Sequence, residues 1–222
     1  MNAKKLSSLF FAAIIGLSGC ATINFSAHYF TPPDNYLQEV TLIWNKILHQ
    51  FSSKRSYALT VVEGENSKKL KGIPAISGTT ILLPDEFIRY IYQNYYNDRA
   101  VIVRCAIVHE LCHTEYGLVS SPPEKHSETD VAAIRVLGGD ATQTAQQYYK
   151  SLQVLKSYWF ARKGVGGHAF NVGWNVANAA ALALVGHGYF VDWFATDIAK
   201  RLQLLSRHYK ISAGSCFRRS RQ

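Results

Sequence analysis

The chain has 222 residues and a mass of 24.9 kDa, and 48% of its residues are hydrophobic while 18% are charged. This composition excludes an intrinsically disordered protein, and the length is enough for one domain with a full core. The formal net charge is +9, but two lysines near the N-terminus and three arginines near the C-terminus contribute five of these charges. The domain itself is therefore only mildly basic. Since no base-reading motif accompanies the charge, we expect no nucleic-acid partner.

The first 19 residues have the pattern of a signal peptide. Two lysines precede an apolar run from Leu9 to Leu17, which has the length of a signal-peptide core and is short for a membrane-spanning helix. The run ends in Leu-Ser-Gly-Cys at Cys20, which resembles the lipobox of bacterial lipoproteins, where the cysteine carries the lipid. Ala21 stands where a retention aspartate would lie. We therefore expect residues 20–34 to tether a periplasmic domain to the outer membrane.

The first part of the domain combines helical and β-prone patterns. Apolar residues at helical spacing predict a helix over Tyr36–Phe51, and β-prone runs predict strands over Tyr57–Val62 and Thr79–Leu83. The polar segment Glu65–Lys71 is typical of an exposed loop, and Asp85 can cap a following helix. Because longer helical patterns follow, the expected fold class is α+β and predominantly helical.

The next predicted helix, Arg99–Tyr116, carries the motif His109-Glu110-Leu111-Cys112-His113 in an otherwise apolar sequence. Positions i and i+4 lie on one face of a helix, so the two imidazoles can hold one zinc ion while Glu110 projects beside them. A helix that is apolar all round is buried, and buried polar groups are costly unless something binds them. The motif predicts a catalytic zinc site, which needs a third protein ligand and leaves the fourth position to water.

The third ligand should come from the predicted helix Ser121–Leu137. At about 100° per residue, His126 and Asp130 fall on its core-facing stripe, whereas Glu128 falls on the opposite side. His126 is therefore the preferred third ligand, and Asp130 can accept an N–H from a ligand histidine. A local shift of the helix would bring Glu128 to the metal, so Glu128 remains the alternative.

The last third of the chain is mostly helical in pattern. A capped helix should run from Asp140 to about Arg162, and the apolar run Trp174–Val185 is too short and polar for a membrane span, so we expect a packed helix there. The segment Val191–Tyr209 has the pattern of an amphipathic helix. Its basic residues are expected on the solvent side: Lys200, Arg201 and Arg207.

The domain should span residues 35–212, with a basic tail at 213–222 that suits an anionic lipid surface. His168 and His187 each stand beside glycines. Spacing assigns neither of them a place in the zinc site, and we expect structural roles.

Three cysteines remain if Cys20 is lipidated. Cys105 and Cys112 are seven residues apart on one predicted helix, about 10 Å along its axis, which is too far for a disulfide. We expect both to be buried free thiols, and nothing in the sequence assigns a partner to Cys216. Cys112 lies inside the histidine pair, but its phase on the helix turns it away from the ligand face.

Between about Thr79 and Lys150, the order of features resembles the zinc peptidases of the CAAX-prenyl-protease and heat-shock-protease type, which are gluzincins. The features are a β-prone run, a helix, the HELCH helix, and the segment HSETDVAAIRVLGGD before a further helix. In that family the second motif reads Glu-x-x-x-Asp, and its glutamate is the third zinc ligand. Asp130 matches the aspartate, whereas His126 stands at the glutamate's position. This substitution keeps a zinc ligand and adds one unit of charge to the cluster.

The resemblance, closest to the soluble periplasmic lipoproteins of the family, implies a zincin-like fold, one Zn²⁺ ion and endopeptidase activity with Glu110 as general base. It also implies that Thr79–Leu83, if it forms an exposed edge strand, binds the substrate as an added strand. Substrates would be polypeptides of the periplasm or outer membrane. Two other classes also fit the motif: a non-enzymatic envelope lipoprotein that keeps zinc for structure, and a zinc amidase that acts on peptidoglycan.

Overall fold

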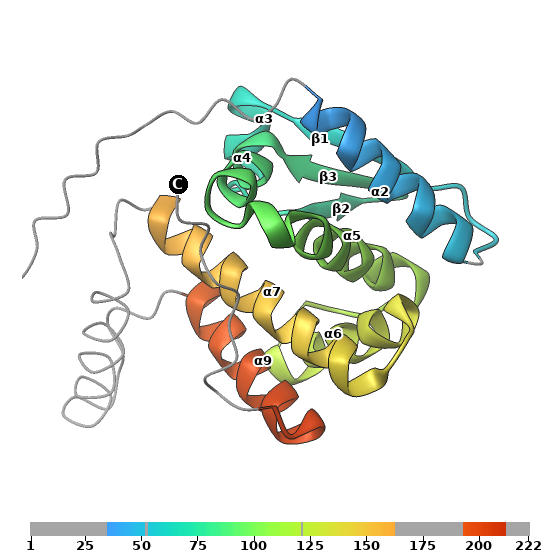
Figure 1. Ribbon diagram of the computed structural model, residues 1–222, viewed down its shortest axis with the longest axis vertical. Coiled ribbons are helices and arrows are strands. Elements are labelled where there is room, and N and C mark those ends of the chain that lie inside the picture. Colours follow the sequence, from blue (N-terminus) through green and yellow to red (C-terminus); the bar gives the residue numbers. More distant parts are fainter. Residues whose placement is uncertain (1–34, 52, 121, 163–192, 212–222) are drawn as a thin grey trace, which may run out of the picture. The chain divides into compact units, whose positions relative to one another are not determined.

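The computed structural model describes residues 35–51, 53–120, 122–162 and 193–211, which are predominantly helical with one small sheet (Figure 1). This confirms the expected α+β class. Within this part of the chain, no helix combines the length and the hydropathy that a membrane crossing requires. The expected leader, the lipid attachment at Cys20, the helix over Trp174–Val185 and the basic tail all lie outside the described residues.

The sheet has three strands in the order β1-β3-β2. β1 (Ala58–Val62) runs parallel to β3 (Thr80–Pro84), and β2 (Ala75–Ser77) pairs with β3 in the antiparallel direction. β3 is therefore the central strand, so the condition under which Thr79–Leu83 would bind substrate as an exposed edge is not met. The strand that covers it, β2, has three residues, too few for an alternating pattern that would predict it.

The polar segment after β1 forms helix α3 (Gly64–Lys69) instead of the expected loop. Ser67 is buried on this helix and donates a hydrogen bond of 3.0 Å to Glu86 Oε1. Lys68 and Glu65 form an exposed ion pair one turn apart. This helix is held by polar contacts, which a search for apolar periodicity does not detect.

Two helices before the histidine motif follow the sequence prediction. α2 (Tyr36–Gln50) and α4 (Asp85–Asn94) begin and end close to the expected residues. Asp85, however, does not cap its own helix. Its carboxylate accepts a hydrogen bond from the Tyr36 hydroxyl and pairs with Arg89, so it ties α4 to α2.

Helix α5 (Arg99–Glu115) lies at the centre of the described domain, after a short 3₁₀ turn over Tyr96–Asp98. It contacts β2 and β3 of the sheet, helix α2, and the C-terminal helices α6 and α7. Its buried side chains point in several directions, as expected for a helix that is apolar all round. Gly117, with φ of +62°, follows its last turn in the left-handed region that glycine adopts without strain.

Three helices lie on the side of α5 away from the sheet: α6 (Pro123–Leu137), α7 (Ala141–Arg162) and α9 (Trp193–Tyr209). Of these, α6 and α7 pack directly against α5. α9 packs against both α6 and α7 (Figure 1). The predicted cap of α7 is present, because the Gln143 backbone N–H donates to Asp140 Oδ1 at 2.7 Å. This packing brings α9, which is far away in the sequence, to the half of α5 that carries the histidines.

Candidate metal centre

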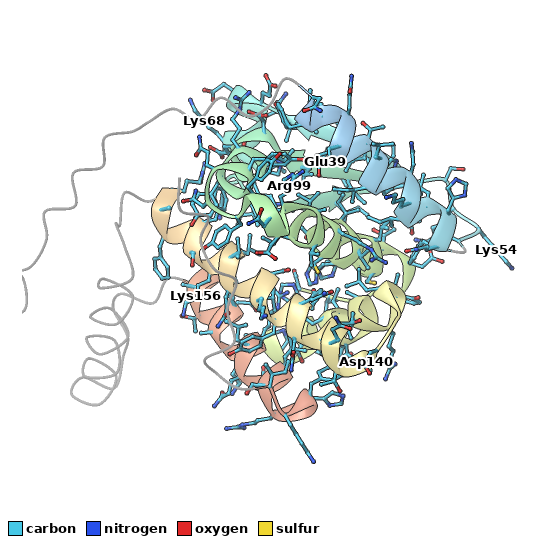
Figure 2. All side chains as sticks on the ribbon, in the orientation of Figure 1. Glu39, Lys54, Lys68, Arg99, Asp140 and Lys156 are labelled. Carbon is cyan, nitrogen blue, oxygen red and sulfur yellow. The ribbon has the colours of Figure 1, made fainter. Side chains whose placement is uncertain are left out.

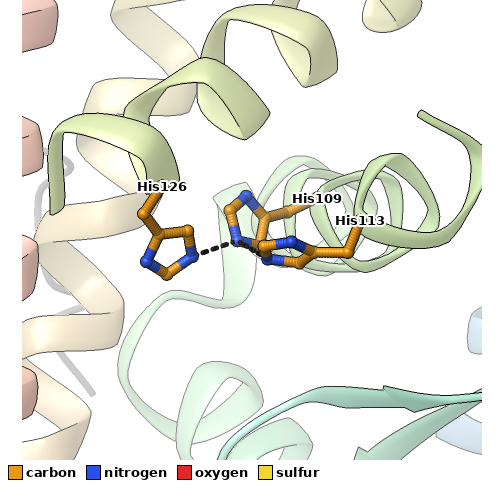
Figure 3. Close-up of side chains that lie close together, drawn as sticks. All are labelled: His109, His113 and His126. Carbon is orange, nitrogen blue, oxygen red and sulfur yellow. Dashed lines mark hydrogen bonds between the residues drawn. The ribbon is translucent and has the colours of Figure 1, made fainter. Parts of the chain in front are cut away.

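Three histidine side chains meet where the C-terminal half of α5 faces the first turns of α6 (Figure 3). His109 and His113 are one turn apart on α5, and His126 is the fourth residue of α6. The Nε2 atoms of His109 and His126 are 2.9 Å apart, and those of His109 and His113 are 3.1 Å apart. One ligand atom from each residue lies within 4.8 Å of the others, so this cluster could hold a metal ion.

The other ring nitrogen of each histidine faces a hydrogen-bond acceptor. His126 Nδ1 is 2.9 Å from Asp197 Oδ2, and His113 Nδ1 is 2.9 Å from the carbonyl oxygen of Leu118. Carboxylate and carbonyl oxygens only accept hydrogen bonds, so a neutral imidazole in either place carries its proton on Nδ1. The lone pair is then on Nε2, the atom that faces the centre of the cluster.

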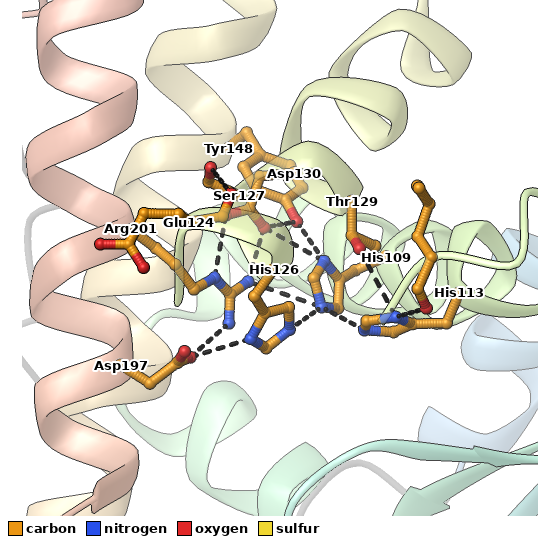
Figure 4. Close-up of polar contacts among 11 residues, drawn as sticks. His109, His113, Glu124, His126, Ser127, Thr129, Asp130, Tyr148, Asp197 and Arg201 are labelled. Atoms are coloured by element: carbon orange, nitrogen blue, oxygen red, sulfur yellow. Dashed lines mark hydrogen bonds and ion pairs between the residues drawn. The ribbon is translucent and has the colours of Figure 1, made fainter. Parts of the chain in front are cut away.

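His109 is oriented in the same way by two residues from different helices (Figure 4). Its Nδ1 lies 3.2 Å from Asp130 Oδ1 on α6 and 2.7 Å from the hydroxyl oxygen of Tyr148 on α7. Tyr148 donates its own proton to Asp130 at 2.8 Å. Asp130 therefore occupies the place that the sequence predicts for it, as acceptor of an N–H from a histidine of the cluster.

Burial favours neutral imidazoles at His109 and His113. Burial, and then the charge of Arg201, hold the pKa of His109 well below its usual value, and burial also lowers the pKa of His113. Neutral imidazole is the form that binds a metal ion. Arg201 Nη2 makes only a long contact of 3.5 Å with His109 Nε2, whereas a metal ion among the three nitrogens would be attracted to all three lone pairs.

The spacing of the nitrogens agrees with the size of a small tetrahedral ion. Two nitrogens that each lie about 2.0–2.1 Å from zinc are about 3.3 Å apart in a tetrahedron. The two Nε2 separations from His109, 2.9 Å to His126 and 3.1 Å to His113, are close to this value. The donor set, the tautomers and the spacing therefore fit a metal ion held by three imidazoles.

Arg201 on α9 binds two buried carboxylates at this site (Figure 4). Its Nε donates to Asp130 Oδ2 at 2.8 Å and its Nη2 to Oδ1, while its Nη1 lies 3.3 Å from Asp197 Oδ2. Burial alone would raise the pKa of Asp130, but the charge and hydrogen bonds of Arg201 hold it well below its usual value. The guanidinium therefore keeps a carboxylate ionised in the interior.

The expectation that Arg201 lies on the solvent side of its helix is wrong, because only 1% of this residue is exposed. A buried acidic partner on another helix draws it inside, and hydropathy does not report such a partner. The position of Arg201 along the helix could have predicted its burial, since Arg201 follows Phe194 by seven residues and precedes Leu205 by four. All three lie on one stripe, and the two apolar residues are buried.

A cavity of about 530 Å³ lies beside the histidines, and Glu110 lines it together with them. Burial raises the pKa of Glu110 to about 8, against the opposing charge of Arg201. The rest of the wall is largely apolar, with side chains from several helices: Phe87, Ile102, Leu152, Leu155 and Phe194. The arrangement offers a carboxyl group next to the cluster in a cavity that favours apolar groups.

Of the two candidates for the third ligand, the structure brings His126 to the pair and leaves Glu128 outside. Glu128 is exposed and pairs with Lys125 on its own helix at 3.0 Å. Cys112 is a buried free thiol outside the cluster, and Cys105 is likewise buried and free. The expectations for His168, His187 and Cys216 concern positions that the structure does not describe.

Comparisons with protein-family models, with curated protein sequences and with solved structures found no match for the chain. The likeness to gluzincin peptidases therefore stays a prediction from the motifs.

Sequence reasoning did not find Tyr148 or Asp197. Tyr148 belongs to a helix with several tyrosines, and nothing distinguishes it before the helices are packed. Asp197 is one turn before Arg201 on α9, and its carboxylate is 2% exposed. Two opposite charges four residues apart on the buried stripe of a helix were the available signal.

Proposed function

We propose that this protein is a zinc-dependent endopeptidase, as the motif and the likeness to gluzincins suggest. The observation that carries the proposal is the convergence of three histidine Nε2 atoms, each with its Nδ1 directed at an acceptor, beside a carboxyl group in a cavity. His109, His113 and His126 would hold the ion, and an imidazole-only set suits zinc among the common metals. Bound there, zinc would act as a Lewis acid that polarises the scissile carbonyl and makes water more acidic.

Glu110 is the residue that we assign to proton transfer. Its carboxylate accepts a proton from the attacking water as the water oxygen bonds to the carbonyl carbon of the substrate. The same carboxyl group then delivers that proton to the amide nitrogen as the carbon–nitrogen bond breaks. Without the ion, burial raises the pKa of Glu110 to about 8, and a dication beside the carboxylate would lower it toward the range in which a group both takes up and releases a proton at neutral pH.

Extended polypeptide segments are the proposed substrates, bound along β2 and not along β3. Among the described residues β2 pairs only with β3, so its other edge is open to a further strand. Ala75 and Ile76 of β2 line the same cavity as His109 and Glu110. A segment added to this edge would present a peptide bond to the histidines and an adjacent side chain to the apolar wall.

A lipid anchor at Cys20 would place this activity at the inner face of the outer membrane, on polypeptides of the periplasm or outer membrane. This part of the proposal depends on the leader pattern alone. Labelling cells with a radioactive fatty acid tests it, because the wild-type chain should take up label and Cys20→Ala should not.

The test of the peptidase uses the purified full-length protein, an unfolded protein substrate and a measured zinc content. We expect one zinc per chain, and we expect Glu110→Gln to keep the zinc but lose about 10²–10⁴-fold in kcat/KM. Glu115→Gln is the matched control, because Glu115 lies on the same helix but binds Ser53 and Tyr57 away from the cavity. Full activity in Glu110→Gln would contradict the mechanism.

The same preparation distinguishes the two rival classes. Cleavage of muropeptides without cleavage of protein would identify a peptidoglycan amidase. Bound zinc with neither substrate cleaved would identify a non-enzymatic envelope protein.

A further inference from the structure

The Nδ1 side of the His126 ring contacts Asp197 of α9 (Figure 4). His126 Nδ1 lies 2.9 Å from Asp197 Oδ2, and the two residues are 6% and 2% exposed. His126 lies at the start of α6, and Asp197 lies about seventy residues later on α9. The orientation of the His126 ring therefore depends on the packing of α9 against α6. Helix α9 reaches two histidines at once: Asp197 contacts His126, and Arg201 reaches His109 through Asp130 and by a long direct contact of 3.5 Å to its Nε2.

The burial of Asp197 would destabilise the fold if this residue served packing alone. Its Oδ1 is buried and accepts no hydrogen bond within the part of the chain that the structure describes, and a buried carboxylate with an unsatisfied oxygen loses free energy. Arg201 already has Asp130 as a close partner on two atoms, and its contact with Asp197 is longer, at 3.3 Å. The contact that Asp197 makes best is therefore the one with His126.

The contact between Asp197 and His126 also bears on the net charge around the metal site. Three neutral imidazoles bring no negative charge to a dication, and Arg201 offsets one of the two buried carboxylates around them. An aspartate that accepts the Nδ1 proton of an imidazole makes the other nitrogen more basic and fixes its direction. The negative charge that remains then lies on Asp197, next to the Nδ1 side of the His126 ring.

We propose that Asp197 is a positioning residue for the metal site: it holds His126 with Nε2 directed at the ion and supplies negative charge that strengthens metal binding. This inference rests on the metal site of the proposed function, and it does not depend on which bond the protein cleaves. Asp197 acts through His126 and does not itself contact the ion.

The first test measures zinc affinity of the full-length protein by competition with a chelating dye. Asp197→Asn keeps the shape of the side chain and removes the charge, and we expect zinc to bind about 10–100-fold more weakly. Asp85→Asn is the matched control, since Asp85 is also a buried carboxylate that pairs with an arginine one turn away. That control should lower the melting temperature and leave zinc affinity unchanged.

A second variant separates positioning from a general effect on packing. In a His126→Glu background the ligand at this position brings its own negative charge, so Asp197 has no imidazole to orient and repels the new carboxylate. Asp197→Asn should then cost less than about threefold in zinc affinity, or improve it. An equal loss in both backgrounds would show a structural role and overturn the proposal, as would wild-type affinity in Asp197→Asn.

If Asp197→Asn does not fold, ¹⁵N chemical shifts of the histidines in the zinc-loaded wild-type protein decide the question. The proposal requires a protonated Nδ1 and a metal-bound Nε2 at His126, and binding through Nδ1 would overturn it. Failure here is distinct from failure of the proposed function. A protein that cleaves no peptide can still lose zinc affinity in Asp197→Asn, and an active peptidase can retain its affinity in that variant.

Discussion

At its N-terminal end, α5 is tied to its neighbours by Arg99, which donates to Glu39 of α2 at 2.9 Å (Figure 2). Tyr92 of α4 donates to the same Glu39 oxygen at 2.8 Å, and the Arg99 guanidinium stacks over Tyr96 at 3.9 Å. In this N-terminal cluster Arg99 and Tyr92 share the Glu39 carboxylate, and Arg99 Nη1 also donates to the carbonyl oxygen of Tyr96 at 2.5 Å. The group is partly exposed, with 22% of the Arg99 side chain and 29% of the Glu39 side chain accessible.

At the C-terminal end of the same helix the polar groups are deeper and incompletely matched. The Nδ1 atoms of the histidines have their acceptors, but the three Nε2 lone pairs face one another. Asp130 and Arg201 are almost wholly inaccessible. Burial and hydrogen bonds alone therefore do not mark a functional cluster. What marks it is the convergence of three imidazole nitrogens on one point, where Arg201 Nη2 gives His109 Nε2 only a long contact of 3.5 Å.

The largest difference should appear in metal content. His126→Ala removes one of the three converging nitrogens, and we expect zinc content to fall from one ion per chain to nearly none after dialysis, because two imidazoles bind zinc weakly. Glu128→Ala, two residues further on the exposed side of α6, should keep one ion. Mass spectrometry of the native proteins and metal analysis measure both. Zinc retained in His126→Ala and lost in Glu128→Ala would reverse the assignment of the third ligand.

The second difference concerns stability. Arg201→Ala leaves Asp130 and Asp197 buried without their cation, and breaking such a pair costs about 3–5 kcal/mol. Arg99→Ala, at the partly exposed N-terminal cluster, should cost about 1 kcal/mol. Urea unfolding followed by circular dichroism measures the two free energies of unfolding. Equal losses would mean that the two ends of α5 do not differ in the way described.

The contrast between the two ends also explains what the sequence could predict. The histidine pair, Glu110 and the choice of His126 over Glu128 follow from periodicity along single helices, and the described geometry agrees with that phase. Asp197, Arg201 and Tyr148 reach the site from α7 and α9, and only the packing of these helices brings them there. Hydropathy predicted an exposed Arg201, because a hydropathy value takes no account of the buried carboxylates that Arg201 binds.

The sheet shows the same limit. A run of β-prone residues predicted β3, but whether a strand lies at the centre or the edge depends on its neighbours. The three-residue strand β2 that changes this assignment leaves almost no pattern in the sequence. Helices with strong apolar periodicity were therefore predictable, and contacts between elements were not.

A third difference between the two ends of α5 should appear in the pH dependence of stability. Burial raises the pKa of Glu110 to about 8 from an ordinary value of 4.5. Between these values the folded protein keeps the proton that the unfolded chain has lost, so this group's contribution to stability is full below about pH 4.5 and is lost as the pH rises through about 8. Glu110→Gln does not titrate. In the presence of a chelator, we expect its melting temperature to gain on the order of 10 °C on the wild-type value between pH 5 and pH 8, since each pH unit in this range costs the wild type up to about 1.4 kcal/mol and 1 kcal/mol corresponds to about 2–4 °C.

The histidines do not disturb this difference. The lowered pKa values of His109 and His113 make both proteins less stable as the pH falls below about 6.5, and this effect cancels in the comparison because both proteins contain the two residues. Glu115→Gln is the control, since hydrogen bonds from Tyr57 and Ser53 lower the pKa of Glu115 and leave it ionised above pH 6 in both states. A difference between Glu110→Gln and wild type that stays constant with pH would show that Glu110 is solvated, and that the C-terminal end of α5 differs from the N-terminal end in its histidines alone.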